Sequence, residues 1–427
     1  MRKGERKLWS RSHFSIGLGG NALAWADFRT SQAIDMKFGN VAFVATCWVL
    51  LLVSWSDAGI INLKCQEGLA KQINDAPPFS TLIADKRCLW RINFSVLIRK
   101  SMTLSGVRLK LVSEVPRTLL KIEAPGVRLH DFVLIGNSGF ADAKATRMPL
   151  LHIVAGNFYV QNGQFYNSTK DGVLVSGERA EIINGPIIGG VIKDIVGRGL
   201  DRDLVSLTTA SAGKVNTKNI VVDNVRMYSS GLRGAVEISD GVEDIFVRNV
   251  YAENCFYAVA IQDHGLGYLQ MNKRVLISNV IAIHSDFAVL SQVVGVRHGE
   301  VSISRVIAKQ CRKALILKNL DWVRVEDVRV IGSQDSGPIV SIYNCANLKL
   351  RDISIGGGKP TISAISVTFP RRVRIEGITL GKHSKAQYGL DLRLRPKSAT
   401  NSLKISHVDL AAARIRRIRV QRVSTIP

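Results

Sequence analysis

The chain has 427 residues, of which 46% are apolar, so it can build a large core and is not generally disordered. Its formal net charge is +24, which favours anionic partners: an acidic polysaccharide, a nucleic acid or a membrane surface. The 8 His and 6 Cys include no Cys-x-x-Cys pair and no histidine cluster with structural-zinc spacing, so a dedicated metal site is not indicated.

A charge-free apolar run occupies residues 41–55. It is shorter than the roughly 20 residues that a membrane-spanning helix needs. Ser56 and Ala58 follow it with the small-x-small pattern of a signal-peptide cleavage site. Met36 directly precedes the run, so we expect residues 36–58 to be a signal peptide that starts at Met36.

Residues 1–35 would then be untranslated or a basic extension. The alternative keeps Met1 and uses the apolar run as an uncleaved membrane anchor. Under both interpretations the body of the chain is exported. We therefore expect a secreted, periplasmic or cell-envelope protein that contacts a membrane only through this segment.

Residues 60–118 are expected to form an N-terminal cap and the first turns of a repeat. Leu69, Ile73 and Ala76 have helical spacing, and Pro77 and Pro78 follow them, which predicts a short amphipathic helix over residues 67–76. Such a helix would cover the open end of a stacked structure.

The cysteines divide into two kinds. Cys65 and Cys88 flank the expected helix and are able to pair in an oxidising compartment. Cys255 and Cys311 share a position in the repeat but lie two units apart, about 10 Å, which is too far for a disulfide, so we expect core thiols.

Over residues 119–410 one unit recurs eleven times: a short alternating strand, a turn, and a second alternating strand with a bend. Residues that tolerate a left-handed conformation dominate the bend. The bend column is Asp131, Asn162, Asn184, Asn224, Asn249, Asn279, Arg305, Asp327, Asp352, Gly377 and His407. No unit buries its apolar face alone, so the units must stack into a β-solenoid.

This repeat resembles the right-handed parallel β-helix of the pectate lyase and polygalacturonase superfamily, whose coils have this length and often carry an asparagine ladder. The resemblance covers residues 61–410 and implies an all-β, right-handed parallel β-helix of about eleven coils with an N-terminal helical cap. Residues 411–427 form a basic C-terminal tail, in which five arginines alternate with apolar residues. It is either a last strand with a solvated face or an electrostatic tether.

Stacking assigns residues of the first strands to columns. One inward column is Val236, Val259, Val289, Leu315, Val340 and Ile365. Glu237 points outward between Ser206 and Ala260, and a second outward column is Ser239, Gln262, Gln292, Lys318 and Tyr343.

A narrower resemblance concerns three successive coils. Polygalacturonases carry Asn-Thr-Asp-Gly, Asp-Asp, Gly-His-Gly and Arg-Ile-Lys on successive coils; this chain has Ser-Thr-Lys-Asp-Gly at 168–172, Asp-Arg-Asp at 201–203 and Ser-Gly-Leu-Arg-Gly at 230–234. The resemblance implies that Asp203 is a general acid, Asp171 its base partner and Arg233 a holder of a uronate carboxylate. Glu237 joins these candidate catalytic residues.

The chain also departs from that pattern. Arg202 replaces the first Asp of the pair, Leu232 and Arg233 stand where the family has His, and no Arg-Ile-Lys follows. The alternative is that Asp171 and Asp203 merely open strands at turns.

A second candidate site lies beyond the strand ends. It consists of Asp240 with Asp263 and His264, plus Glu237. Asp240 and Asp263, one coil apart, would be about 5 Å from each other, close enough to hold a calcium ion; a turn pair satisfied by backbone amides is the alternative. The strand offset places Asp240 roughly 20 Å from Asp171 and Asp203, which predicts two separate sites in an extended groove. Candidate substrate-binding residues are Asp201, Gln262, His264, Lys318 and Tyr343, and the rings of Phe256, Tyr257, Phe287, Trp322 and Tyr343 offer stacking faces.

The expected function is therefore that of an exported, monomeric β-helix protein that binds an acidic polysaccharide and, in its enzymatic version, cleaves it as a hydrolase or lyase. The alternative is a non-catalytic envelope or matrix protein with the same groove. Export and the lack of a recognised motif argue against nucleic acid. A phage-type solenoid would be expected to show threonine-rich or trimer-forming segments, which are not visible.

Overall fold

The computed structural model describes residues 59–138, 147–176, 186–209, 217–264, 271–292, 297–358, 362–381, 386–394, 402–410, 413 and 416–422. The expected signal peptide or anchor at 36–58, the extension at 1–35 and Asn184 lie outside these ranges. Within them, no helix has both the length and the apolar character needed to cross a membrane.

The described chain folds into two long parallel sheets. Sheet 1 has 16 strands, namely β1 (Ile60–Leu63), β2 (Thr81–Ala84), β3 (Trp90–Ile92), β5 (Thr103–Ser105), β6 (Arg108–Leu111), β8 (Arg128–Ile135), β10 (Phe158–Tyr166), β12 (Ile187–Arg198), β14 (Thr217–Tyr228), β16 (Glu243–Glu253), β18 (Lys273–Ile283), β20 (His298–Lys309), β22 (Leu320–Ile331), β24 (Asn347–Gly356), β26 (Arg372–Leu380) and β28 (Ser402–Asp409). Sheet 2 has 13 strands, namely β4 (Val96–Ile98), β7 (Leu120–Ile122), β9 (Leu151–Ile153), β11 (Val173–Val175), β13 (Val205–Thr208), β15 (Gly234–Ser239), β17 (Tyr257–Gln262), β19 (Phe287–Gln292), β21 (Lys313–Lys318), β23 (Val340–Tyr343), β25 (Ser363–Thr368), β27 (Tyr388–Leu394) and β29 (Arg416–Arg422).

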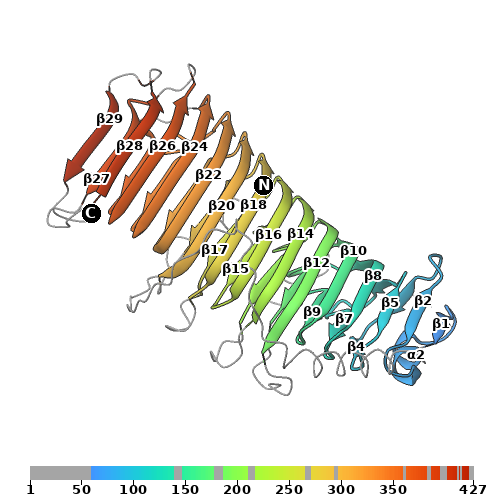
Figure 1. Cartoon of the computed structure of the whole chain (residues 1–427). Helices are drawn as coiled ribbons and strands as arrows, with labels where there is room; N and C mark the ends of the chain where they lie inside the picture. Colours follow the sequence, from blue (N-terminus) through green and yellow to red (C-terminus); the bar gives the residue numbers. More distant parts are fainter. Residues whose placement is uncertain are drawn as a thin grey trace, which may run out of the picture.

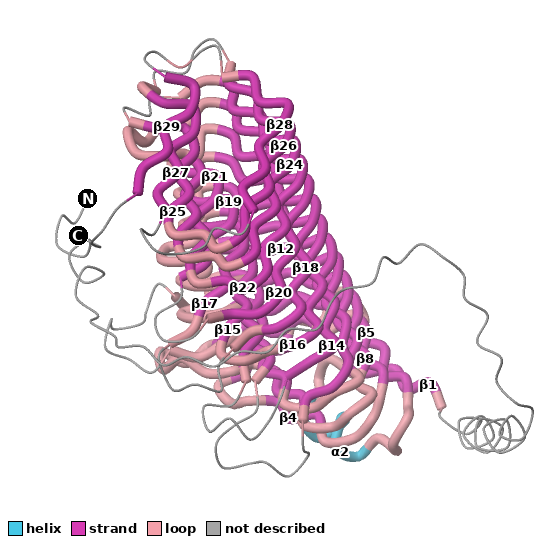
Figure 2. Tube along the Cα trace, turned by 60° about the vertical axis from the view of Figure 1, so that its left-hand side comes forward, coloured by secondary structure: helices cyan, strands magenta, loops and turns pink. Residues whose placement is uncertain are grey.

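From β6 onward the chain alternates between the sheets, and each strand pairs in parallel with the strand one coil away, as β15 does with β13 and β17. The coils stack into a rod that runs from β1 to β29, with the colours of the sequence in order along it (Figure 1). Turned by 60°, the same rod shows strands running side by side along its whole length (Figure 2). This is a parallel β-helix, and the expected fold class is confirmed.

The predicted repeat corresponds to strands β7 to β27 of sheet 2, and β4 and β29 add a coil at each end. In the basic segment near the C-terminus, the described residues 416–422 form the last strand, β29, which pairs in parallel with β27. In that strand Arg419 forms an ion pair with Asp391 at 2.6 Å and lies over the ring of Tyr388.

The core lies between the two sheets. The predicted inward column is confirmed: Val236, Val259, Val289 and Leu315 are partners in successive strands, and all four are fully buried. Alternating strands place one apolar residue per coil in such a column, so each coil buries its apolar face only against its neighbours.

The bend column adopts the predicted left-handed conformation. Asn162, Asn224, Asn249 and Asn279 have φ between 50° and 56°, and the Asn279 side chain donates to Asn249 Oδ1 at 2.9 Å. In the third position the structure has Asp194, at φ 54°, where the sequence interpretation placed Asn184. The strand register shows that Asp194 is the neighbour of Asn162, because the next residues, Gly163 and Ile195, are partners on β10 and β12.

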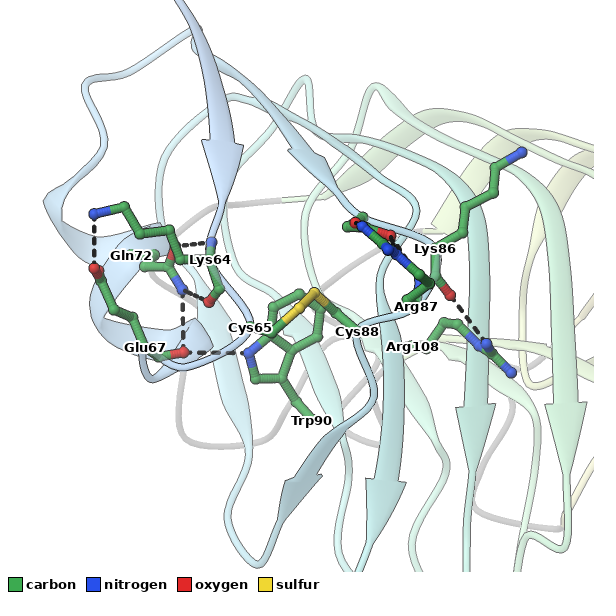
Figure 3. The surroundings of a disulfide bond; sticks show 10 residues. Lys64, Cys65, Glu67, Gln72, Lys86, Arg87, Cys88, Trp90 and Arg108 are labelled. Carbon is green, nitrogen blue, oxygen red and sulfur yellow. Dashed lines mark hydrogen bonds and ion pairs between the residues drawn. A yellow bond between two sulfur atoms is a disulfide. The ribbon is translucent and has the colours of Figure 1, made fainter.

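The N-terminal end is closed by helix α2 (Leu69–Asp75), as expected. Its Leu69 and Ile73 are buried, and the helix lies at the β1 end of the rod (Figure 1). The predicted disulfide between Cys65 and Cys88 is present, with the two Cα atoms 5.2 Å apart. Beside it the Trp90 indole donates to the Glu67 carbonyl at 3.2 Å (Figure 3).

The expectation for the other cysteines is also confirmed: Cys255 and Cys311 are free and buried, as is Cys345. Burial raises the pKa of the Cys255 and Cys311 thiols to about 11, so these are unreactive core residues.

Candidate functional site

Charged side chains gather on the outward side of sheet 2, over strands β11, β13, β15 and β17. They come from the segments just before or just after these strands, and from the centre of β15 itself. We call this set the charged cluster; it consists of Lys170, Asp171, Arg202, Asp203, Arg233, Glu237, Asp240 and His264.

Glu237 lies at the centre of the charged cluster. Its Oε2 is 2.6 Å from Arg233 Nη1 and 3.2 Å from Arg202 Nη2, and it accepts a hydrogen bond from Ser206 Oγ at 3.2 Å. Its Oε1 is 3.3 Å from His264 Nε2. Because Ser206 and Glu237 are register partners on β13 and β15, these contacts depend directly on the stacking of coils.

Asp203 precedes β13 and faces the same two arginines. Its Oδ2 is 3.5 Å from Arg233 Nη1 and 3.9 Å from Arg202 Nη2. Its Oδ1 accepts hydrogen bonds from the Tyr257 hydroxyl at 2.8 Å and from the Gly234 amide at 3.3 Å. Asp203 and Glu237 thus share Arg233 Nη1, which holds their two carboxyl groups close together.

Asp171 lies one coil before Asp203. Its Oδ1 accepts from the Asp203 amide at 3.4 Å and lies 3.4 Å from Arg202 Nε. Its Oδ2 is 3.9 Å from Lys170 Nζ. The predicted grouping of Asp171, Asp203, Arg233 and Glu237 is therefore what the structure shows.

His264, just after β17, connects Glu237 to Asp240. Its Nδ1 lies 2.7 Å from Asp240 Oδ2, and its backbone amide donates to Asp240 Oδ1 at 2.9 Å. Thr208 Oγ1 also donates to Asp240 Oδ2, at 3.1 Å. His264 therefore bridges the centre of strand β15 and the turn that follows it.

The expectation of two separate sites is wrong. Asp203 does precede its strand and Asp240 does follow the next one, but the side chains of Glu237 and His264 fill the interval and make one continuous network. Backbone spacing set the predicted separation, and it ignored the length of these two side chains.

The calcium hypothesis for Asp240 and Asp263 also needs correction. Both oxygens of Asp240 accept from protein donors, His264 and Thr208. Asp263 is buried. Over the described ranges, no three His, Cys, Asp or Glu side chains are arranged to hold a metal ion.

The electrostatic surroundings separate the two central carboxyls. Burial raises the pKa of Asp203 well above its usual value, and the nearby charges of Glu237 and Asp171 raise it further. Burial opposes ionisation of Glu237 too, but hydrogen bonding to His264 and the charges of Arg233 hold its pKa well below the usual value. Asp203 thus favours the neutral form and Glu237 the ionised form.

The remaining groups follow the same logic. Burial raises the pKa of Asp171 against the opposing charge of Arg202. The hydrogen bond to Asp240, and to a smaller extent the one to Glu237, raises the pKa of His264 to about 9. This imidazole is therefore cationic at neutral pH.

Burial also divides the cluster by sign. The side chains of Asp171, Asp203 and Glu237 are 0% exposed, whereas Arg233, Arg202, Lys170 and His264 are 13%, 19%, 23% and 36% exposed. The accessible edge of the charged cluster is therefore cationic.

The other predicted substrate-binding residues divide into two groups. Gln262 is buried and donates to the Tyr257 hydroxyl at 3.2 Å, and Asp201 is partly buried, which raises its pKa. Lys318 and Tyr343 are register partners on β21 and β23, two and three coils beyond β17. They do not belong to the charged cluster.

Two residues, Arg202 and Tyr257, have contacts in the charged cluster that the sequence did not indicate. Arg202, which counted as a departure from the polygalacturonase pattern, contacts three carboxyls. Tyr257, expected to offer a stacking face, is 1% exposed and bonds to Asp203 instead. The sequence did contain a signal for both. Arg202 lies just before a strand and Tyr257 begins one, at the strand entries where Asp171 and Asp203 also lie.

Comparisons with known proteins come from structure alone. No protein-family description matches the chain, and no curated protein matches it in sequence. The N-terminal fragment of bacteriophage phi29 gene product 12 superposes with a TM-score of 0.63 at 13% identity, over 83% of this chain and 68% of that one. The chain is a parallel β-helix protein.

Two further structures are similar to the chain at low identity. The pre-mature phi29 gene product 12 has a TM-score of 0.52 at 12% identity, over 74% of this chain and 48% of that one. A family 28 exopolygalacturonase of Yersinia enterocolitica has a TM-score of 0.48 at 11% identity, over 87% and 79%. Of these matches, the two with a TM-score above 0.5 are both phi29 gene product 12, at 12–13% identity, so the likeness shows the fold and not a function.

Proposed function

We propose that this β-helix protein binds an acidic polysaccharide at the cationic edge of the charged cluster. The observation that carries the proposal is the division by sign: fully buried carboxyls lie behind partly exposed Lys170, Arg202, Arg233 and His264. A polymer that meets this surface contacts cations first.

Charge balance supports an anionic ligand. The cluster holds four basic and four acidic groups, but the raised pKa of Asp203 favours its neutral form while His264 is protonated below about pH 9. Both shifts move the charge of the cluster in the positive direction, in a chain whose formal charge is already +24.

Arginine geometry supports a carboxylate ligand. The contacts of Arg233 with cluster carboxyls use Nη1. A guanidinium has five N–H donors in a planar fork, so its other edge suits the bidentate binding of a uronate carboxylate. We also propose that binding takes place outside the cytoplasm, because the Cys65–Cys88 disulfide fits an oxidising compartment.

The test is calorimetric titration with polygalacturonate, using dextran as the uncharged control polymer. Arg233→Gln is expected to weaken binding about tenfold, as loss of a charged bidentate contact does. Arg248→Gln removes the same charge from the exposed face of β16 and is expected to bind like wild type. Equal affinity of the two variants would overturn the proposal, and circular dichroism checks that both are folded.

Cleavage of the polymer is the second candidate function. It is favoured by one observation, the adjacent carboxyls Asp203 and Glu237 with pKa values shifted in opposite directions, the pattern of a general acid and its ionised partner. Their close approach around Arg233 Nη1 differs from the roughly 6.5–9.5 Å separation of an inverting glycosidase. Their burial means that a substrate would have to displace the arginines.

Turnover separates the two candidates. Release of reducing ends and absorbance of unsaturated products are followed in parallel for wild type and Asp203→Asn. Loss of turnover in the variant would support a hydrolase or lyase; binding without turnover in the wild type supports a non-catalytic envelope or matrix protein.

A further inference from the structure

Four basic residues form a straight row on the outward face of sheet 1. Arg324, Lys349, Arg374 and Lys404 are register partners on the successive strands β22, β24, β26 and β28. Parallel neighbours in a sheet are about 4.8 Å apart, so the row presents one cation per coil along the rod axis. We call it the cationic ladder.

The cationic ladder is accessible. The side chains of Arg324, Lys349 and Arg374 are 51%, 34% and 59% exposed, and Lys404 is exposed as well. Arg372, on β26 two residues before Arg374, is a further exposed cation on this face.

The fold does not require these cations. In earlier coils of the same sheet the same register position holds Val221, Phe246 and Leu276, and β14, β16 and β18 pair just as β22 to β28 do. Like charges directly opposite each other on neighbouring strands are destabilising. A row of four is therefore a cost to stability that a bound anion would relieve.

Nearby carboxylates offset only part of this charge. Glu326 lies 2.7 Å from Arg324 and 3.6 Å from Lys349, and it also contacts Arg351. Glu376 lies 3.3 Å from Arg374. The four ladder cations thus face the two carboxylates Glu326 and Glu376, which leaves an excess of positive charge along the ladder.

We propose that the cationic ladder is a second binding surface, which holds an acidic polysaccharide extended along the rod axis with one carboxylate per coil. The ligand class rests on the proposed function, but the residues and the sheet are different. One strand spacing is close to the length of one sugar residue in an extended chain. Trp322, 42% exposed on β22 beside Arg324, offers a flat face for a sugar ring at one end of the row.

A nucleic acid fits this surface less well. Single-strand binders stack successive bases on several aromatic side chains, whereas Trp322 is the single Phe, Tyr or Trp on β22, β24, β26 and β28. Duplex DNA presents one charge per about 1.7 Å of axis, which does not match one cation per coil.

The experiment compares a ladder variant with a matched control. Lys349→Gln/Arg374→Gln removes two ladder charges; Arg226→Gln/Arg248→Gln removes two exposed charges from β14 and β16 of the same sheet. Affinity is measured for oligogalacturonates of two to eight units and as a function of salt, with circular dichroism as the check on folding.

In the wild type, affinity is expected to rise with length up to at least four units. The ladder variant is expected to lose this rise and to show a shallower dependence of affinity on salt, while the control keeps both. Equal behaviour of the ladder variant and the control would overturn the inference. Tighter binding of an oligodeoxynucleotide than of the uronate, lost in the ladder variant, would overturn the ligand class.

The two proposals fail separately. If Arg233→Gln has no effect on binding while the ladder variant loses it, the charged cluster is not the binding site and the ladder stands. If Arg233→Gln weakens binding and the ladder variant does not, the ladder is refuted and the cluster stands.

Discussion

At the scale of single residues, Asp203 and Glu237 share two arginines but have opposite electrostatic roles. Asparagine at 203 can still accept hydrogen bonds from Tyr257 and Gly234, and it carries no buried charge. Glu237, in contrast, is the ionised partner of Arg202, Arg233 and His264. The two carboxyls should therefore respond very differently to the loss of charge.

We expect Asp203→Asn to change the free energy of unfolding by less than about 1 kcal/mol at neutral pH, because the amide replaces a carboxyl that favours its neutral form. We expect Glu237→Gln to lower it by about 3–5 kcal/mol, because Arg202 and Arg233, only 19% and 13% exposed, lose a fully buried counter-charge. Urea denaturation of both variants measures the difference. Similar losses for both would show that Asp203 is also ionised.

His264 should make stability depend on pH. Its pKa is raised from 6.5 to about 9 by Asp240 and Glu237. A raised folded-state pKa means that the contribution is fully present below about pH 6.5 and is lost as the pH rises through about 9. Thermal melts from pH 6 to 10 should therefore show a wild-type advantage over His264→Gln that disappears at the alkaline end. An advantage that is constant with pH would contradict this assignment.

At the scale of the element, the stability of each coil depends on its left-handed bend. Asn279 has φ 54° and donates to Asn249, and Arg305 of the next coil bonds to Asn279 in turn. Asparagine tolerates this conformation better than residues with an unbranched apolar side chain, and glycine adopts it freely.

Replacement of Asn279 tests the bend. Asn279→Ala is expected to lower the free energy of unfolding by about 1–3 kcal/mol, from strain at positive φ and the lost hydrogen bond. Asn279→Gly removes the same hydrogen bond without the strain and should lose clearly less. Denaturant titration distinguishes the two, and equal losses would mean that the strain at this bend is negligible.

The sequence could predict these bends because the conformation is local and residue type decides it. It could also predict the alignment of Ser206, Glu237 and Ala260, since period-two strands fix which residues share a column. It could also place Glu237, Asp240 and His264 in one candidate site. It could not predict that the His264 imidazole contacts both carboxyls, because those contacts depend on side-chain reach across a turn. The role of Arg202 was hidden for the same reason: its guanidinium reaches Glu237 on the next coil, 35 residues later.

At the scale of the whole molecule, the protein is a rod whose coils contact only their neighbours, so stability is a sum of local terms and the ends are vulnerable. The N-terminal end carries two closures, helix α2 and the Cys65–Cys88 disulfide, and Trp90 packs beside both (Figure 3). The first coils should therefore depend on this disulfide more than coils in the middle of the rod do.

The double variant Cys65→Ala/Cys88→Ala is expected to lower the free energy of unfolding of the first coils by about 3 kcal/mol, since the bridge closes a loop with a sequence separation of 23. Hydrogen exchange should show lost protection in β1 to β3 and unchanged protection in β20 to β24. Reducing agent should reproduce this pattern in the wild type and leave the variant unaffected, because Cys255, Cys311 and Cys345 are already free. Uniform loss of protection along the rod would instead mean that the coils unfold as one cooperative unit, and the nearest-neighbour description of this solenoid would be wrong.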